Sequence, residues 1–341
     1  MEKKNIEWSK LGFGYMKTDF RYTRKWENGA WGEGSLTDKA EVTISECAGV
    51  LQYAQTGFEG LKVYTTESGK IVAFRPDLNA ERLQNTCKRL MMPSISKEDF
   101  LKALDELVKA NAAWVPPFGS GATLYIRPFI YGSGPVIGVA PAPEYEFRMF
   151  CTPVGPYFKG GIKPLRLKLS DYDRAAPHGT GNIKAGLNYA MSIYAGEVAH
   201  QEGFNENMYL DAGTRTYVEE TGGANFLFVT KDGKVVTPKS DSILPSITRR
   251  SLMSVARDYL NLEIEERPVA FSEVPSFAEC GLCGTAAVIS PVGLIHTKDG
   301  DIKFASGMEK MGPVISRLRE TLTGIQMGTI KAPEGWIHEI I

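Results

Sequence analysis

The sequence contains little cysteine and histidine. Of its 341 residues, five are Cys and four are His. The cysteines are odd in number and scattered, which excludes a secreted disulfide framework. Cys280 and Cys283 have redox or zinc spacing, but no second Cys pair or His-rich helix supplies two more zinc ligands. We therefore expect no metal, and we favour a chance spacing of this pair over a redox role.

The sequence also lacks a charge excess and a long apolar run. It has 39 basic and 40 acidic residues, a net charge of −1, so nothing suggests attraction to nucleic acid or to an anionic membrane. No apolar run reaches the length of a membrane span. The first residues carry charges with no apolar stretch after them, so no signal peptide is evident. We expect a cytoplasmic protein with no nucleic-acid or membrane partner.

The length of the chain favours two domains. A stretch rich in Gly and Pro, residues 150–164, separates two different sequence patterns. It predicts a boundary near residue 160. We expect a small N-terminal domain at 1–155, a linker at 156–165 and a larger C-terminal domain at 166–341.

The most informative stretch is Gly179-Thr-Gly-Asn-Ile-Lys-Ala-Gly-Leu-Asn-Tyr-Ala190. Glycines flank Lys184, and a helix that stops at Gly203 is expected soon after it. A lysine at the edge of a packed core loses its proton more easily and can attack a carbonyl, and nearby glycines let a planar ligand approach. A lone lysine in such a turn is more often structural. A nucleotide phosphate loop is excluded because Ala185, and not Ser or Thr, follows the lysine.

Three motifs in the first half carry candidate binding groups. Phe58-Glu-Gly60 follows a short predicted helix. Pro76 is expected to hold Arg75 extended at a strand end, where its guanidinium suits a phosphate. Tyr125 and Arg127 share one face of a predicted strand at 122–131, and in a pocket such a pair reads a carboxylate. Short strand-like pieces are expected around residues 12–18. Residues 96–99, Ser-Lys-Glu-Asp, have the form of a capping box, so a helix is expected to start there.

The second half carries an acid and two turns. Glu219 and Glu220 are adjacent on a predicted strand, so only one of them faces inward. Pro245 and Ser246 mark the start of a helix, whose free N–H groups suit a phosphate. A Gly-Thr-Ala turn contains Thr285. Residues 208–211 and 216–219 are expected to form a pair of strands.

Taken together, these motifs resemble the branched-chain amino-acid aminotransferases, members of the class IV group of pyridoxal-phosphate enzymes. The resemblance runs from Phe13 to Thr285 in the family's order and spacing. It implies a two-domain α/β fold of class IV with the site at the domain interface. It implies pyridoxal 5'-phosphate as cofactor, held by Lys184 as a Schiff base. The activity implied is transamination of leucine, isoleucine and valine with 2-oxoglutarate, giving branched-chain 2-oxo acids and glutamate.

The resemblance also assigns the other site residues. Lys184 would move the proton between substrate and cofactor, Glu220 would keep the pyridine nitrogen protonated, and Tyr189 would bond the phenolic oxygen of the ring. The phosphate would be anchored by Arg75, Ile247, Thr248 and Thr285. The substrate pocket would be built from Phe13, Tyr53, Phe58, Tyr125, Arg127, Tyr157, Ala286 and the partner's Val139. A homodimer is implied, in which the loop at 132–144 reaches into the partner's site.

The chain departs from the family pattern at a few positions. Leu187 stands where many members have a second glycine, and Gly223 and Ala224 replace larger residues. Ala287 and Ser290 stand where some members carry a redox Cys pair. D-amino-acid aminotransferases and aminodeoxychorismate lyases share the cofactor apparatus, but chain length and the set of Tyr125, Arg127 and Tyr157 favour the branched-chain enzymes. The alternative outside the enzymes is a binding protein on the same scaffold that has no catalytic activity. The sequence leaves open the preferred amino acid, the direction of flux in the cell and any assembly beyond a dimer.

Overall fold

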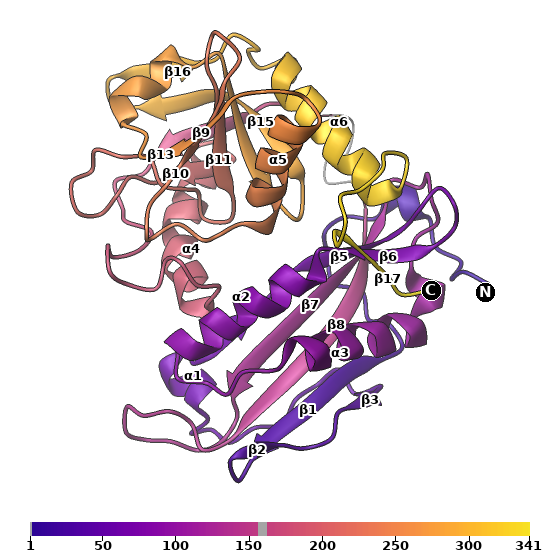
Figure 1. Cartoon of the computed structure of the whole chain (residues 1–341). Coiled ribbons are helices and arrows are strands. Elements are labelled where there is room, and N and C mark those ends of the chain that lie inside the picture. Colours follow the sequence, from indigo (N-terminus) through magenta and orange to yellow (C-terminus); the bar gives the residue numbers. More distant parts are fainter. Residues whose placement is uncertain (1, 156–161) are drawn as a thin grey trace. The chain divides into compact units, whose positions relative to one another are not determined.

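The computed structural model describes residues 2–155 and 162–341 (Figure 1). The described residues form two compact units. The first holds residues 2–155 with Ile183–Leu187 and Ile325–Ile341, and the second holds residues 162–182 and Asn188–Gly324. The short segment with Lys184 therefore packs with the first unit, while the chain on either side of it belongs to the second. The expected linker at 156–165 lies largely outside the described residues, and the domain limits stay a prediction.

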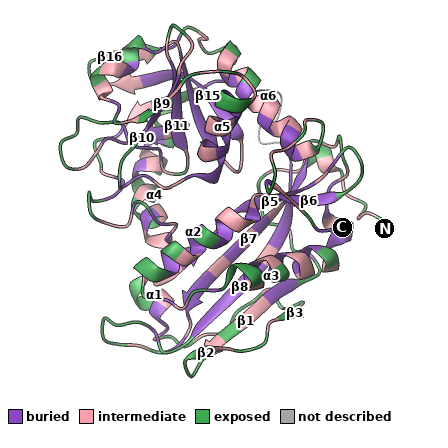
Figure 2. Ribbon diagram, viewed as in Figure 1, coloured by how far each residue is buried: buried purple, intermediate pink, exposed green. Residues whose placement is uncertain are grey.

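The first unit is built on a nine-stranded antiparallel sheet. Its strand order is β17-β6-β5-β7-β8-β1-β2, with β3 added on β1 and β4 on β7. The strands are β1 (Arg21–Glu27), β2 (Ala30–Trp31), β3 (Ser35–Thr37), β4 (Thr56–Phe58), β5 (Leu61–Thr65), β6 (Ile71–Phe74), β7 (Thr123–Gly132), β8 (Tyr145–Val154) and β17 (Ile337–Glu339). Figure 2 shows the central strands of this sheet as buried.

Helices α2 (Pro76–Arg89) and α3 (Lys97–Ala110) pack beside each other on this sheet, and α1 (Gly49–Tyr53) is a short helix before β4 (Figure 1). The predicted capping box is confirmed, since the Ser96 side chain accepts from the Asp99 N–H at 3.0 Å. The apolar stripe of α3, which includes Phe100 and Leu104, is buried in the core. Short 3-10 helices lie at Trp8–Lys10 and Ala112–Trp114.

The second unit contains an eight-stranded mixed sheet of order β10-β9-β15-β14-β11-β12-β13, with β16 on β15. Strand β9 runs parallel to β10 and β15, and β12 runs parallel to β13. The strands are β9 (Leu165–Leu169), β10 (Glu206–Met208), β11 (Asn225–Val229), β12 (Val235–Pro238), β13 (Ile264–Arg267), β14 (Glu279–Gly284), β15 (Val288–Thr297) and β16 (Gly300–Lys303). The remaining helices are α4 (Gly186–Gln201), α5 (Ile247–Asp258) and α6 (Pro313–Met327), with a 3-10 helix at Phe271–Ser276.

One predicted strand region is wrong and a second is only partly formed. Residues 12–18 form no strand, and there the Met16 N–H donates to the Thr152 hydroxyl instead of to a strand partner. The segments predicted at 208–211 and 216–219 do pair antiparallel, through the bridge of Leu210 with Val218 and the Asp211 N–H bond to the Tyr217 carbonyl at 2.8 Å, but they do not form continuous strands. Their connecting backbone is satisfied by a side chain, since the Asp211 carboxylate accepts from three N–H groups of the following turn.

Across residues 2–155 and 162–341, no helix combines the length and the apolar composition needed to cross a membrane.

Candidate functional site

The backbone around Lys184 is fixed on both sides within the first unit. Ala185 forms an antiparallel bridge with Gly57 of β4, and the Phe58 N–H donates to the Lys184 carbonyl at 3.0 Å. On the other side, the Lys184 N–H donates to the Thr86 hydroxyl of α2 at 3.1 Å. A Cβ at Gly57 would come within 2.5 Å of the Thr86 methyl group, so only glycine allows this approach.

The Lys184 amine lies in surroundings that favour its neutral form. Its Nζ is 4.7 Å from the centroid of the Phe58 ring. Burial lowers the pKa of Lys184 to about 8, and the positive charges of Arg82 and Arg127 act in the same direction, whereas Glu59 and Tyr125 act against it. With this pKa, about a tenth of the amine is unprotonated at pH 7, far more than for an ordinary lysine, and a carbonyl-attacking lysine requires this neutral form.

Aromatic groups and one arginine gather near this lysine. Arg127 donates to the Tyr125 hydroxyl at 3.0 Å, which confirms that the two side chains share one face of β7. The Arg127 guanidinium lies 4.8 Å from the Phe58 ring centroid. The Phe13 ring meets Tyr125 edge to face, with centroids 5.1 Å apart. The structure thus brings Phe13, Phe58, Tyr125 and Arg127 into one cluster, in which Phe58 lies beside the Lys184 amine.

The backbone expectation for Arg75 is wrong. Its φ of 48° and ψ of 46° are left-handed and not extended. The Arg75 N–H donates to the Trp336 carbonyl at 2.8 Å, and its guanidinium lies 4.5 Å from the Trp336 ring centroid. These tertiary contacts outweigh a local strain of about 1–3 kcal/mol. Such strain concentrates at functional sites, and the phosphate role stays a prediction.

Two further residues predicted for a substrate pocket are exposed. Val139, 89% exposed, lies near the tip of the loop at 132–144. Tyr53, 39% exposed, donates its hydroxyl to the Ile137 carbonyl of the same loop. The loop is anchored at its base, where the Gly49 N–H donates to the Gly134 carbonyl at 3.3 Å. Tyr157, also predicted to line the pocket, lies outside the described residues.

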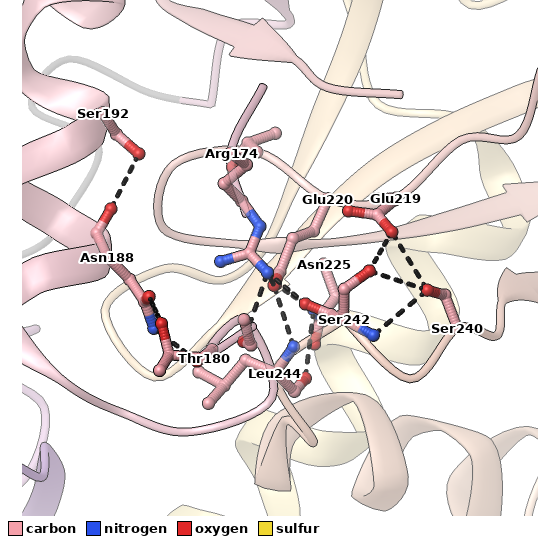
Figure 3. Close-up of polar contacts among 12 residues, drawn as sticks. Arg174, Thr180, Asn188, Ser192, Glu219, Glu220, Asn225, Ser240, Ser242 and Leu244 are labelled. Atoms are coloured by element: carbon pink, nitrogen blue, oxygen red, sulfur yellow. Dashed lines mark hydrogen bonds and ion pairs between the residues drawn. The ribbon is translucent and has the colours of Figure 1, made fainter. Parts of the chain in front are cut away.

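In the second unit, the carboxylate of Glu220 is buried and held from three directions (Figure 3). The Arg174 guanidinium contacts Oε1 at 2.9 Å, the Leu244 N–H donates to the same oxygen at 2.8 Å, and the Asn225 amide donates to Oε2 at 2.6 Å. Positive charge and N–H donors favour the ionised form of a carboxylate. Glu219 contacts a different set, the hydroxyls of Ser240 and Ser242, as strand alternation predicts.

Arg174 is a site residue that the sequence did not reveal. Besides Glu220, its guanidinium donates to the carbonyls of Gly181 and Ser242. A Cβ at Gly181 would come within 2.5 Å of the arginine, which explains the glycine there. No motif marked Arg174, because its partners lie 7 to 68 residues away in sequence.

The predicted phosphate-binding turns lie in the second unit. Ser246 caps α5 by accepting from the Arg249 N–H at 3.1 Å, so Ile247 and Thr248 occupy the first turn of the helix. The turn that begins at Gly284 and contains Thr285 and Ala286 lies beside Gly223 and Ala224. Tyr189 is half-buried on α4, next to Asn188, whose amide donates to the Thr180 carbonyl at 2.7 Å (Figure 3).

The cysteine pair has neither the geometry nor the reactivity of a redox switch. Cys280 and Cys283 are three residues apart on β14, so their side chains point to opposite faces, and both are free and buried. Burial raises the pKa of Cys283 to about 12 and that of Cys280 well above its usual value. The preference for a chance spacing is supported. Across residues 2–155 and 162–341, no group of three His, Cys, Asp or Glu could hold a metal ion.

The residues present fit a pyridoxal-type cofactor. A lysine with a lowered pKa, a buried carboxylate paired with a guanidinium and a capped helix N-terminus are the groups that an aldehyde, a ring nitrogen and a phosphate require. The family model of the class IV aminotransferases matches residues 56–295, and the chain belongs to this family. Class IV aminotransferases are pyridoxal-phosphate enzymes, so the predicted class, fold and cofactor are confirmed.

Within this family, the chain is similar over its full length to branched-chain-amino-acid aminotransferases. The chain is 49% identical to the branched-chain-amino-acid aminotransferase of Haemophilus influenzae, with 99% of each chain covered. It is 47% identical to that of Helicobacter pylori, with 98% of each covered. The fold matches the pyridoxal-phosphate form of the branched-chain amino acid aminotransferase of Thermobaculum terrenum at a TM-score of 0.78 and 25% identity, over 95% of this chain and 99% of the other.

Proposed function

We propose that the protein is a pyridoxal-phosphate-dependent branched-chain-amino-acid transaminase. It would exchange the amino group of leucine, isoleucine or valine with 2-oxoglutarate. The observation that carries the proposal is Lys184, whose backbone is clamped between β4 and α2 and whose amine has a lowered pKa beside aromatic side chains. The similarity to full-length branched-chain enzymes supports the substrate class.

The proposed roles combine what the resemblance implies with the surroundings of each residue. Bound pyridoxal phosphate supplies an electron sink for the electron pair left when the substrate loses its α-proton. The Lys184 amine would take that proton from the substrate α-carbon and deliver it to the cofactor carbon. Glu220, paired with Arg174 at 2.9 Å, would keep a proton on the ring nitrogen.

The remaining groups would bind and orient. Tyr189 would bond the phenolic oxygen of the cofactor. Arg75, Ile247, Thr248 and Thr285 would hold the phosphate, and the Ala286 N–H would meet the substrate carboxylate. Phe13, Tyr53, Phe58, Tyr125 and Tyr157 would wall the pocket for a branched side chain. Arg127 would receive the γ-carboxylate of glutamate.

The proposal includes a homodimer. The exposed Val139 would insert, on the loop at 132–144, into the site of the partner subunit. An exposed apolar tip on an anchored loop is typical of a docking element. The five free cysteines are consistent with a reducing, cytoplasmic compartment.

Transamination assays across a panel of amino acids test the proposal. We expect turnover of L-leucine, L-isoleucine and L-valine with 2-oxoglutarate. Preference for D-amino acids, or release of pyruvate from aminodeoxychorismate, would assign the chain to one of the other class IV activities. Lack of any turnover by the cofactor-loaded protein would instead support a silent binding protein.

A further inference from the structure

A buried ion pair that has no role in the account above lies next to the lysine segment. Glu59 is 0% exposed and Arg82 is 6% exposed. Arg82 contacts the two carboxylate oxygens through Nε and Nη2, both at 2.8 Å, and the Asn79 amide donates to Oε2 at 2.7 Å. Burying two charges is costly and often brings no net stability, so such a pair calls for another explanation.

Glu59 and Arg82 both lie next to the residues whose hydrogen bonds hold the Lys184 backbone. Glu59 directly follows Phe58, whose N–H donates to the Lys184 carbonyl and whose ring lies 4.7 Å from Nζ. Arg82 lies one helical turn before Thr86, whose hydroxyl donates to the Arg82 carbonyl at 3.1 Å and accepts from the Lys184 N–H. The pair therefore joins β4 to α2 where the two elements receive the lysine.

The charges of the pair also act on the lysine amine, and with opposite signs. Arg82 lowers the pKa of Lys184 and Glu59 raises it. Among the other groups that act on this amine, Tyr125 raises its pKa and Arg127 lowers it. While the pair is intact, its two charges offset each other. Removing one member leaves a single uncompensated charge close to the amine.

We propose that Glu59 and Arg82 are positioning residues that set the protonation state of Lys184 and hold β4 and α2 in the register that receives it. The proposal rests on the proposed role of Lys184 in catalysis. It explains why the Glu of the Phe-Glu-Gly motif is buried: its carboxylate balances Arg82 instead of contacting substrate.

The test is the pH dependence of amine modification at Lys184 in the full-length, cofactor-free protein, followed by mass spectrometry of the peptide. Glu59→Gln leaves Arg82 unbalanced and is expected to lower the apparent pKa of Lys184 by about one unit. Arg82→Gln leaves Glu59 unbalanced and is expected to raise it by about one unit. Arg82→Lys keeps the positive charge, so the apparent pKa of Lys184 should stay near its wild-type value.

Glu81→Gln is the matched control, since it removes one charge from the exposed position next to Arg82 on the same helix. Shifts no larger than this control, or shifts of the same sign in both pair variants, would overturn the proposal. The expected direction of the Lys184 pKa shift differs between Glu59→Gln and Arg82→Gln. Either variant alone therefore tests the proposal, provided that it folds. The readout is the amine itself, so it keeps its meaning even if the cofactor is found attached to another lysine.

Discussion

In the proposed reaction, Arg127 would serve two kinds of substrate, one apolar and one with a γ-carboxylate, in the same pocket. It packs against the Phe58 ring and bonds Tyr125, so its charge is presented at the edge of an aromatic cluster and does not line the whole pocket. Removing the partner of a buried charge costs about 2–5 kcal/mol. Losing a methylene contact costs only about 1–3 kcal/mol.

Arg127→Met is therefore expected to lower kcat/KM for glutamate and 2-oxoglutarate far more than for leucine, isoleucine or valine. Steady-state half-reactions with each substrate measure this. An equal loss for leucine and glutamate would mean that Arg127 supports the shape of the pocket and does not read the carboxylate.

Glu220 and Glu219 offer a matched comparison of two buried neighbours. Glu220→Gln removes the negative charge beside Arg174 and is expected to lower kcat by about 100-fold or more. Glu219→Gln keeps an oxygen that can accept from Ser240 and Ser242, so its activity should stay close to wild type. Turnover assays on both variants decide, and equal impairment would show that the assignment of the acid is wrong.

At the scale of elements, the clamp on Lys184 depends on one hydroxyl of α2. Thr86→Val removes the acceptor of the Lys184 N–H, which costs about 1–3 kcal/mol for an unsatisfied buried donor. Thr86→Ser keeps the hydroxyl and loses only a methyl group. We expect Thr86→Val to lower both Tm and cofactor affinity, with a much smaller effect for Thr86→Ser. A larger loss in Thr86→Ser than in Thr86→Val would mean that the methyl packing, and not the hydrogen bond, holds the segment.

Local signals predicted several elements correctly. The cap at Ser96, the start of α5 after Ser246 and the alternation along β7 each depend on residues within one or two turns. The left-handed Arg75 could not be predicted, because Trp336, which contacts it, lies far away in sequence. The same holds for Arg174 and for the pair of Glu59 and Arg82, whose partners are distant along the chain.

At the scale of the whole molecule, protonation of Lys184 makes the free energy of unfolding depend on pH. Its pKa is about 8 in the folded protein and about 10.5 in the unfolded chain, so between these values the unfolded state binds more protons. Stability from this group therefore rises as pH increases through that window, and near pH 7 the buried amine is destabilising.

We expect cofactor-free Lys184→Met to be more stable than wild type at pH 7, by roughly 1–2 kcal/mol, with the gap closing by about pH 10. Urea unfolding of both proteins across this range measures the difference, in which other titrating groups cancel. A gap that is constant with pH would show that the gain comes from packing alone.

The most direct test of the central claim is the site of cofactor attachment. The yellow protein is reduced with borohydride and digested, and the peptides are identified by mass spectrometry. The account predicts the reduced cofactor on the peptide that contains Lys184, and a folded but inactive Lys184→Ala protein that acquires no such label. Attachment to a different lysine, or Lys184→Ala activity above about one hundredth of wild type, would contradict it.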